Sequence, residues 1–177
     1  LKGEGMILTY SFNKNWILDN GFVPAHLHQK FKGGLSFVML VDYHDSNVGP
    51  YKELMFVPGL FHIDGKYQLM ITKIYVDSDE SVEAGRENWG IPKEKADISW
   101  TKDGARTLFS AASNQKFFEA EIHSNSINFP VNNTLIPFKF YQELKGDSFL
   151  FAPQGKGKAT FARVKGIHSN QMKFPDL

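Results

Sequence analysis

Short apolar segments separated by turn residues recur along most of the chain, and this pattern constrains the fold more than any other feature. The segment Leu35–Tyr43 is apolar on both alternating faces at its centre, which is typical of a well-buried strand. Ile98–Trp100 and Thr107–Ala111 flank Thr101–Ala105, which contains an Asp-Gly pair, and this spacing predicts a β-hairpin. Strands at such spacing favour an antiparallel barrel or sandwich over alternating strand–helix units.

Further strands are predicted from the same pattern. They lie at Met6–Phe12, Leu54–Val57, Leu60–Ile63, Tyr67–Val76, Lys116–His123, Leu135–Phe140 and Thr160–Val164. Asp64-Gly65 would form the turn that leads into the long run Tyr67–Val76. No stretch resembles a linker, so we expect a single domain over residues 1–177. Because the first residue is Leu1, we also expect that this domain is shortened at its N-terminus.

One helix is clearly predicted, from about Asp79 to Asn88. Ser78 and its acidic neighbours can cap its N-terminus, Gly90 suits the residue after its last turn, and Pro92 prevents its continuation. A second, poorly specified helix is predicted within Val23–Phe31.

Composition excludes several classes of function. The 20 basic and 19 acidic residues give a net charge of +1, without the positive excess typical of nucleic-acid binding. There is no cysteine, which excludes disulfides, thiol catalysis and cysteine-bound zinc. No run of about 18 apolar residues occurs, so we expect no membrane partner and a cytoplasmic location. His26 and His28 lack an obvious third ligand, and we expect no metal site.

The aromatic content is high, with 16 Phe, 6 Tyr and 3 Trp. So many rings need a large apolar interior. We expect some of them to line a dry cavity as well as to fill a core.

The sharpest motif surrounds the end of the predicted helix, where Gly85-Arg86-Glu87 is followed by Gly90-Ile91-Pro92-Lys93. This block resembles the signature of the acetoacetate decarboxylase family. Other segments resemble that family too: His44-Asp45-Ser46, Gly49-Pro50-Tyr51-Lys52-Glu53, Gly166-Ile167-His168 and Phe174-Pro175-Asp176-Leu177. The resemblance covers most of the chain and implies an α+β, mainly β fold, a closed antiparallel β-barrel with a few peripheral helices.

The resemblance also implies roles for four residues. Lys93 would form a Schiff base with a substrate ketone, and Glu53 would orient the substrate or move a proton. Arg86 could attract the substrate carboxylate, although a structural ion pair is the alternative that we favour. Trp89 could form a wall of the pocket, with a place in the core as the alternative. Val82, Arg86 and Trp89 are spaced to share one face of the predicted helix.

A Schiff-base lysine must lose its proton before it can attack. A free lysine has a pKa of about 10.4, so very little of it is neutral at pH 7. Burial disfavours the ammonium and lowers this pKa, and lysine activation in acetoacetate decarboxylase is a standard example of such tuning. We therefore expect Lys93 and Glu53 to share one enclosed, apolar pocket.

The sequence departs from the family pattern at two places. Glu94 follows Lys93, where the well-known decarboxylases have a second lysine. Because neighbouring side chains of a strand alternate, we expect Glu94 to point away from the pocket. Lys95 would share the side of Lys93 and could supply positive charge there, although a solvated surface lysine is the alternative that we favour. The family's second glutamate corresponds here to Val38 or Met39, which makes the pocket more apolar.

These observations favour a cofactor-free lyase that forms a lysine Schiff base with a small β-keto acid and decarboxylates it. One alternative is an aldolase or dehydratase that uses Lys93 on a larger oxo acid. A barrel that binds a small ligand without turnover is another, since fold does not settle function. The resemblance implies a homo-oligomer.

Overall fold

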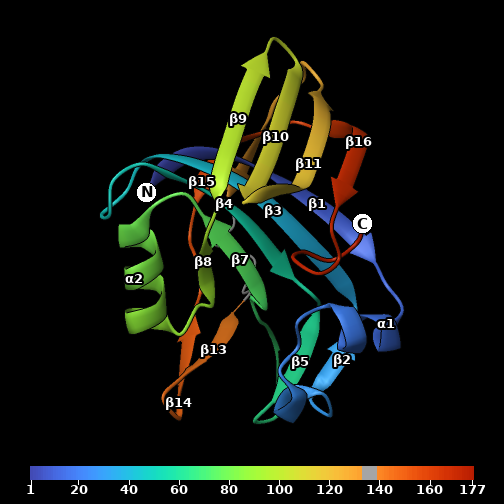
Figure 1. Cartoon of the computed structure of the whole chain (residues 1–177), viewed down its shortest axis with the longest axis vertical. Coiled ribbons are helices and arrows are strands. Elements are labelled where there is room, and N and C mark those ends of the chain that lie inside the picture. The colour runs from blue at the N-terminus through green and yellow to red at the C-terminus, as the bar shows by residue number, and fades with distance from the viewer. Residues whose placement is uncertain (133–138) are drawn as a thin grey trace.

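Strands dominate the computed structural model of the chain, which describes residues 1–132 and 139–177 and arranges its strands in four sheets (Figure 1). The prediction of a mainly β fold is confirmed. The predicted strand Leu135–Phe140 falls largely outside the described residues.

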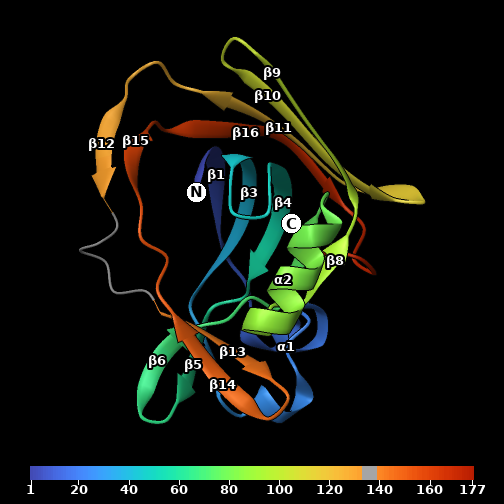
Figure 2. The ribbon, with the colours of Figure 1, turned by 90° about the vertical axis from the view of Figure 1, so that its left-hand side faces the viewer.

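The first sheet carries the site described below. Its strands, in spatial order, are β1 (Lys2–Ser11), β3 (Leu35–Asp45), β4 (Tyr51–Val57), β7 (Lys73–Val76) and β8 (Lys93–Lys95). Neighbouring strands are antiparallel except β7 and β8, which are parallel. The helix α2 (Asp79–Trp89) connects these two strands and lies beside β8 (Figure 2).

The other three sheets surround the first one. The second sheet contains β16 (Ala162–Ser169), β11 (Gln115–Ser124), β10 (Arg106–Ser113) and β9 (Asp97–Asp103). The third contains β14 (Asp147–Phe151), β13 (Phe140–Leu144), β6 (Lys66–Leu69), β5 (Leu60–Ile63) and β2 (Phe31–Gly33). A two-stranded ribbon pairs β12 (Phe129–Asn132) with β15 (Lys156–Ala159). In Figure 1 the second sheet lies at the top of the view and the third at the bottom.

The prediction of a closed antiparallel barrel is wrong. Within residues 1–132 and 139–177 no sheet closes on itself: β1 and β8 are the outer strands of the first sheet, and β16 and β9 those of the second. Two pairings, β7 with β8 and β6 with β13, are parallel. Alternating apolar residues predict strands, but closure depends on pairing between the first and last strands of a sheet, which alternation does not specify.

One long predicted strand is divided between two sheets. The run Tyr67–Val76 forms β6 in the third sheet and β7 in the first. At the break, the Thr72 hydroxyl donates to the carbonyl of Gly21 at 2.7 Å, and its amide donates to the carbonyl of Phe56 at 3.1 Å. Both bonds satisfy backbone groups at the break, namely the carbonyl of Gly21, and the amide of Thr72 with the carbonyl of Phe56.

The helices agree with the prediction in one case of two. The predicted helix at Asp79–Asn88 is α2, whereas Val23–Phe31 contains only a short 3-10 turn, η1 (Ala25–Leu27). A short helix that the sequence did not predict, α1 (Lys14–Asn20), precedes it. In the described part of the chain, no helix is long and apolar enough to cross a membrane.

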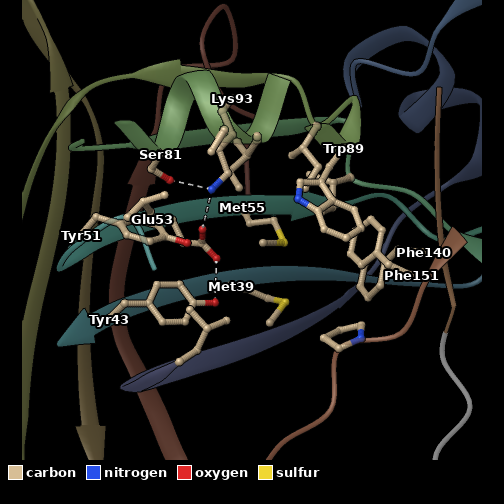
Figure 3. A pocket seen from close by; sticks show the side chains of 18 of the residues that line it. Met39, Tyr43, Tyr51, Glu53, Met55, Ser81, Trp89, Lys93, Phe140 and Phe151 are labelled. Carbon is tan, nitrogen blue, oxygen red and sulfur yellow. Dashed lines mark hydrogen bonds and ion pairs between the residues drawn. The ribbon is translucent and has the colours of Figure 1, made fainter. Parts of the chain in front are cut away.

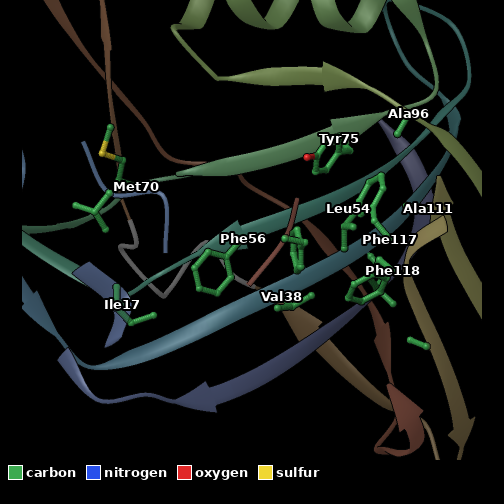
Figure 4. Packing of buried hydrophobic residues seen from close by; sticks show 14 of the residues in the cluster. Ile17, Val38, Leu54, Phe56, Met70, Tyr75, Ala96, Ala111, Phe117 and Phe118 are labelled. Atoms are coloured by element: carbon green, nitrogen blue, oxygen red, sulfur yellow. The ribbon is translucent and has the colours of Figure 1, made fainter. Parts of the chain in front are cut away.

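The larger apolar core fills one face of the first sheet. Residues of β3 and β4 such as Val38 and Leu54 lie in one cluster with Phe118 of the second sheet there (Figure 4), and both are fully buried. Rings pack against one another in this layer: Tyr75 lies 4.6 Å from Phe117, centre to centre, and Phe118 lies 5.2 Å from Phe174. Most of the apolar burial expected from the aromatic content is therefore achieved on this side.

Candidate active site

Lys93 owes its position to a strand–helix–strand unit. The chain leaves β7 at Val76, passes through α2 and returns in β8, where Lys93 pairs opposite Ile74. Parallel strands need a crossover of about a dozen residues or more, and α2 supplies it. The lysine is therefore the first residue of a strand at the edge of the first sheet.

Local signals fix both ends of the helix. The Ser78 hydroxyl accepts a hydrogen bond from the amide of Ser81 at 3.1 Å and caps the N-terminus. At the other end Gly90 has a φ of 63°, in the left-handed region, and its amide donates to the carbonyl of Gly85. Glycine adopts this conformation without strain, so the chain turns out of the helix three residues before Lys93.

The aliphatic part of Lys93 passes directly beneath α2. A Cβ atom added to Gly85 would lie 2.6 Å from Cδ of Lys93, so only glycine leaves room for this side chain. The Arg86 guanidinium donates from Nε to the carbonyl oxygen of Lys93 at 2.6 Å. The helix thus holds both the side chain and the backbone of Lys93, which is 7% exposed.

The amine of Lys93 lies among three polar or aromatic side chains (Figure 3). Its Nζ donates to Oγ of Ser81 at 2.8 Å and lies 3.7 Å from Oε2 of Glu53. The ring centre of Tyr51 is 4.8 Å away, within the range of a cation–π contact. Apart from these contacts the amine faces the cavity described below.

Glu53 comes from β4 and is 3% exposed. Its second carboxylate oxygen accepts a hydrogen bond from the Tyr43 hydroxyl at 3.3 Å. Tyr43 and Tyr51 lie opposite each other on β3 and β4, and their ring centres are 4.8 Å apart. The two tyrosines and Glu53 thus form one end of the site.

Burial shifts the two ionisable groups in opposite directions. It lowers the pKa of the Lys93 amine, and it raises the pKa of the Glu53 carboxyl. The attraction between the two groups opposes both shifts, as does the Tyr43 hydrogen bond at Glu53, but burial is the larger cause in each case. Both shifts favour a neutral amine beside a protonated carboxyl, which are the states needed to attack a carbonyl and to protonate its oxygen.

A cavity of about 490 Å³ opens from the amine. One end is polar and contains Lys93, Glu53 and Ser81, and the remainder is lined mainly by apolar side chains. Among the lining residues are Met39, Met55, Ile71, Ile74, Trp89, Ile91, Phe140 and Phe151. Its size lies within the range of about 300–1,000 Å³ that is usual for small-molecule sites.

The structure brings three of the four predicted site residues together. Lys93 and Glu53 share the cavity, and Trp89 lines it while remaining 48% exposed. Arg86 is exposed and lies outside the lining, bound to the backbone of Lys93. This placement gives Arg86 a structural contact, and a role in binding a carboxylate stays a prediction.

The neighbours of Lys93 in sequence point elsewhere. Glu94 lies on the other side of β8 and pairs with Lys73 at 2.5 Å, as strand alternation predicts. Lys95 is exposed, as the favoured interpretation expects, and its Nζ binds Asp79 at 2.9 Å outside the cavity, so it does not add positive charge there. Of Val38 and Met39, the two candidates for the position of the family's second glutamate, it is Met39 that lines the cavity.

Sequence reasoning missed Ser81, Tyr43 and Tyr51 as members of the site. Ser81 and Gly85 are the buried residues of α2, and their spacing of one helical turn could have identified the inner face. The place of Tyr43 and Tyr51 in the site follows from the register of β3 and β4, because that register puts both side chains on the same face of the sheet as Glu53.

The family model described as acetoacetate decarboxylase (ADC) matches residues 2–169. No curated protein matches the sequence.

Several solved structures share the fold. An acetoacetate decarboxylase from Legionella pneumophila is 13% identical, with a TM-score of 0.65 over 92% of this chain and 70% of that one. Another acetoacetate decarboxylase is 15% identical, with a TM-score of 0.67 over 96% of this chain and 74% of that one. The enduracididine biosynthesis enzyme MppR, complexed with the condensation product of pyruvate and imidazole 4-carboxaldehyde, is 14% identical, with a TM-score of 0.60 over 80% and 61%.

Proposed function

The chain belongs to the acetoacetate decarboxylase family, and we propose that it is a lyase that binds a β-keto acid covalently through Lys93 and releases carbon dioxide from it. The observation that carries this proposal is the buried Lys93 amine, 3.7 Å from the Glu53 carboxylate, at the polar end of an otherwise apolar cavity.

The first step is formation of the Schiff base. Neutral Lys93 attacks the ketone carbon, a C–N bond forms, and the carbonyl oxygen leaves as water after it has received two protons. The Glu53 carboxyl lies within reach of the amine, and burial keeps its pKa raised, so it can carry a proton from nitrogen to oxygen. Ser81 holds the amine toward the cavity.

The second step breaks the bond between the α-carbon and the carboxylate. The electron pair of that bond moves toward the cationic imine nitrogen, which acts as the electron sink, and carbon dioxide leaves. The carboxylate loses its charge in this step, and an apolar cavity offers that charge little solvation in the bound state. Protonation of the enamine carbon and hydrolysis of the imine release the ketone and regenerate Lys93, without a need for a cofactor.

A second candidate function is aldol condensation followed by dehydration, with the same Schiff base. The size of the cavity favours it, because about 490 Å³ leaves room for a second reactant beside a small oxo acid. The similar structure of MppR holds a condensation product of pyruvate and an aldehyde.

Borohydride trapping tests the proposal and separates the candidates. We expect incubation with acetoacetate and sodium borohydride to leave a reduced adduct on the peptide that contains Lys93, and untreated protein to release carbon dioxide. Lys93→Ala should abolish both signals. The matched control is Lys95→Ala, which removes an exposed lysine bound to Asp79 outside the cavity and should retain both.

Other outcomes would redirect the assignment. An adduct with pyruvate, together with no carbon dioxide from acetoacetate, would favour condensation chemistry. If folded protein gave no adduct with either compound, Lys93 would not be the nucleophile. The remaining candidate function would then be binding of a small ligand without turnover.

A further inference from the structure

Resting on the proposed function, we propose that the substrate is an oxo acid with an extended apolar substituent, aliphatic or aromatic, rather than a four-carbon keto acid. The substituent would lie against a wall formed by Trp89, Phe140 and Phe151, which we call the aromatic wall. The carbonyl carbon would lie at Lys93.

The cavity has more room than a four-carbon acid can use. Its volume of about 490 Å³ corresponds to roughly sixteen water molecules at ~30 Å³ each. A four-carbon keto acid bound at Lys93 would leave most of this space to water. Water at the apolar end would find few polar partners, because the side chains there are largely hydrocarbon and sulfur.

The aromatic wall lies at the end of the cavity away from Glu53 (Figure 3). Phe140 and Phe151 stack with their planes 12° apart and their ring centres 5.4 Å apart, and Trp89 meets Phe151 edge-on at 5.8 Å. These contacts hold the three rings in place before a ligand arrives. They come from α2 and from the hairpin of β13 and β14, which border this end of the cavity.

Charge explains why the substituent should be apolar. Of the side chains that the described residues contribute to the lining, Lys93 and Glu53 are the charged ones, and both lie at the polar end. The nearby guanidinium of Arg86 is directed to the backbone of Lys93 instead. A charged group placed against the aromatic wall would lose its hydration without gaining a partner, which is strongly unfavourable.

The exposure of Trp89 is consistent with this use. A large apolar side chain at the end of a helix is 48% exposed although its indole lines the cavity. A bound apolar chain would cover part of this surface, and each buried methylene would strengthen binding by about fourfold (~0.8 kcal/mol).

The test is a comparison of acetoacetate, 3-oxohexanoate and 3-oxooctanoate with the full chain. We would measure kcat/KM for carbon dioxide release and the concentration that gives half-maximal borohydride labelling of Lys93. We expect kcat/KM to rise about tenfold or more from the shortest to the longest acid, and the half-maximal concentration to fall by a similar factor. The labelling readout applies whether the chemistry is decarboxylation or condensation.

A variant of the aromatic wall sharpens the test. Phe151→Ala should reduce the advantage of 3-oxooctanoate over acetoacetate by about tenfold. The matched control is Leu108→Ala in β10, which shortens a partly exposed apolar side chain of the second sheet and should leave that ratio unchanged. Thermal denaturation of both variants would show that they are folded.

The failures can be told apart. Labelling of Lys93 by all three acids, with no gain from chain length, would overturn the apolar substituent and leave the Schiff-base function standing. An unchanged ratio in Phe151→Ala would overturn the aromatic wall as its binding surface. Absence of labelling by all three acids would overturn the proposed function itself.

Discussion

The two faces of the first sheet are built from alternate residues of the same strands, yet one is filled and the other is hollow. Leu54 and Phe56 of β4 point into the larger core, and both are fully buried. Glu53 and Met55, their neighbours, point to the opposite face and line the cavity. A single stretch of β4 therefore supplies both a core and a candidate reaction site.

What covers each face explains the difference. The filled face packs against the second sheet, and Phe174, from the segment after β16, lies edge-on to both Phe56 of the first sheet and Phe118 of the second. The other face is covered by α2 and by the third sheet, and the buried Lys93 and Glu53 interrupt its apolar packing. Buried ionisable groups and open volume both reduce stability relative to a filled core, so the hollow face gives up stability that the filled face retains.

The largest expected effect is on activity at the hollow face. Lys93→Met should lower the rate of carbon dioxide release by about ten-thousandfold or more, because the covalent route is lost. The melting temperature should stay unchanged or rise in the double variant Lys93→Met, Glu53→Met, because apolar side chains then replace both members of the buried pair, whereas removal of Lys93 alone leaves Glu53 buried without its partner. Activity assays on Lys93→Met and calorimetry on the double variant measure the two quantities, and a large fall in the melting temperature of the double variant would contradict the division between the faces.

The next largest expected effect is a difference between the two faces in how much a truncated side chain lowers the free energy of unfolding. Phe56→Ala should lower the free energy of unfolding by about 3–5 kcal/mol, as is usual for a fully buried ring in a packed core. Met55→Ala, one residue earlier, should cost about half as much or less, because its side chain already borders open volume. Urea denaturation of the two variants tests the comparison directly, and equal losses would refute it.

The carboxylate of the hollow face should affect both rate and pH dependence. Glu53→Gln should lower kcat by about a hundredfold or more, the usual range for a lost acid–base group. The carboxylate raises the pKa of Lys93 against the effect of burial, so its removal lowers that pKa further. The acidic limb of the pH profile for borohydride labelling should therefore move to lower pH; a shift to higher pH would be inconsistent with this pairing.

The smallest effect distinguishes two serines of α2. Ser81→Ala should slow labelling of Lys93 by about fivefold, because the amine loses a hydrogen-bond partner worth roughly 1 kcal/mol. Ser78→Ala removes the N-cap instead, and should lower the free energy of unfolding by about 1 kcal/mol with a smaller effect on labelling. Similar labelling rates in the two variants would argue against a specific role for Ser81.

The sequence predicted those parts of the site that depend on local signals. Ser78, Gly90 and Pro92 mark the ends of α2 within a few residues, and the motif around Lys93 indicated the family. The pairing of Lys93 with Glu53 came from the resemblance, because the two residues lie in different strands and nothing in the local pattern joins them.

The predictions that failed depended on long-range pairing or on the choice of a helix face. β8 has three residues, too few for an alternating pattern to reveal the parallel strand that places Lys93 in the site. Val82, Arg86 and Trp89 are spaced to share one face of α2, but the buried residues of this helix are small ones, Ser81 and Gly85. Apolar content is a poor guide to the inner face where that face must leave space for another side chain.

The close passage of Lys93 beneath Gly85 links the acidity of the amine to the docking of α2. Burial under the helix lowers the pKa of Lys93, so a conformation in which α2 lifts away would hold a proton on this amine more tightly than the closed one does. By thermodynamic reciprocity, each proton that the amine takes up weakens the closure of the helix over it. A proton would thus bind such an open conformation more tightly than the closed one, and it competes with the substrate for the same nitrogen.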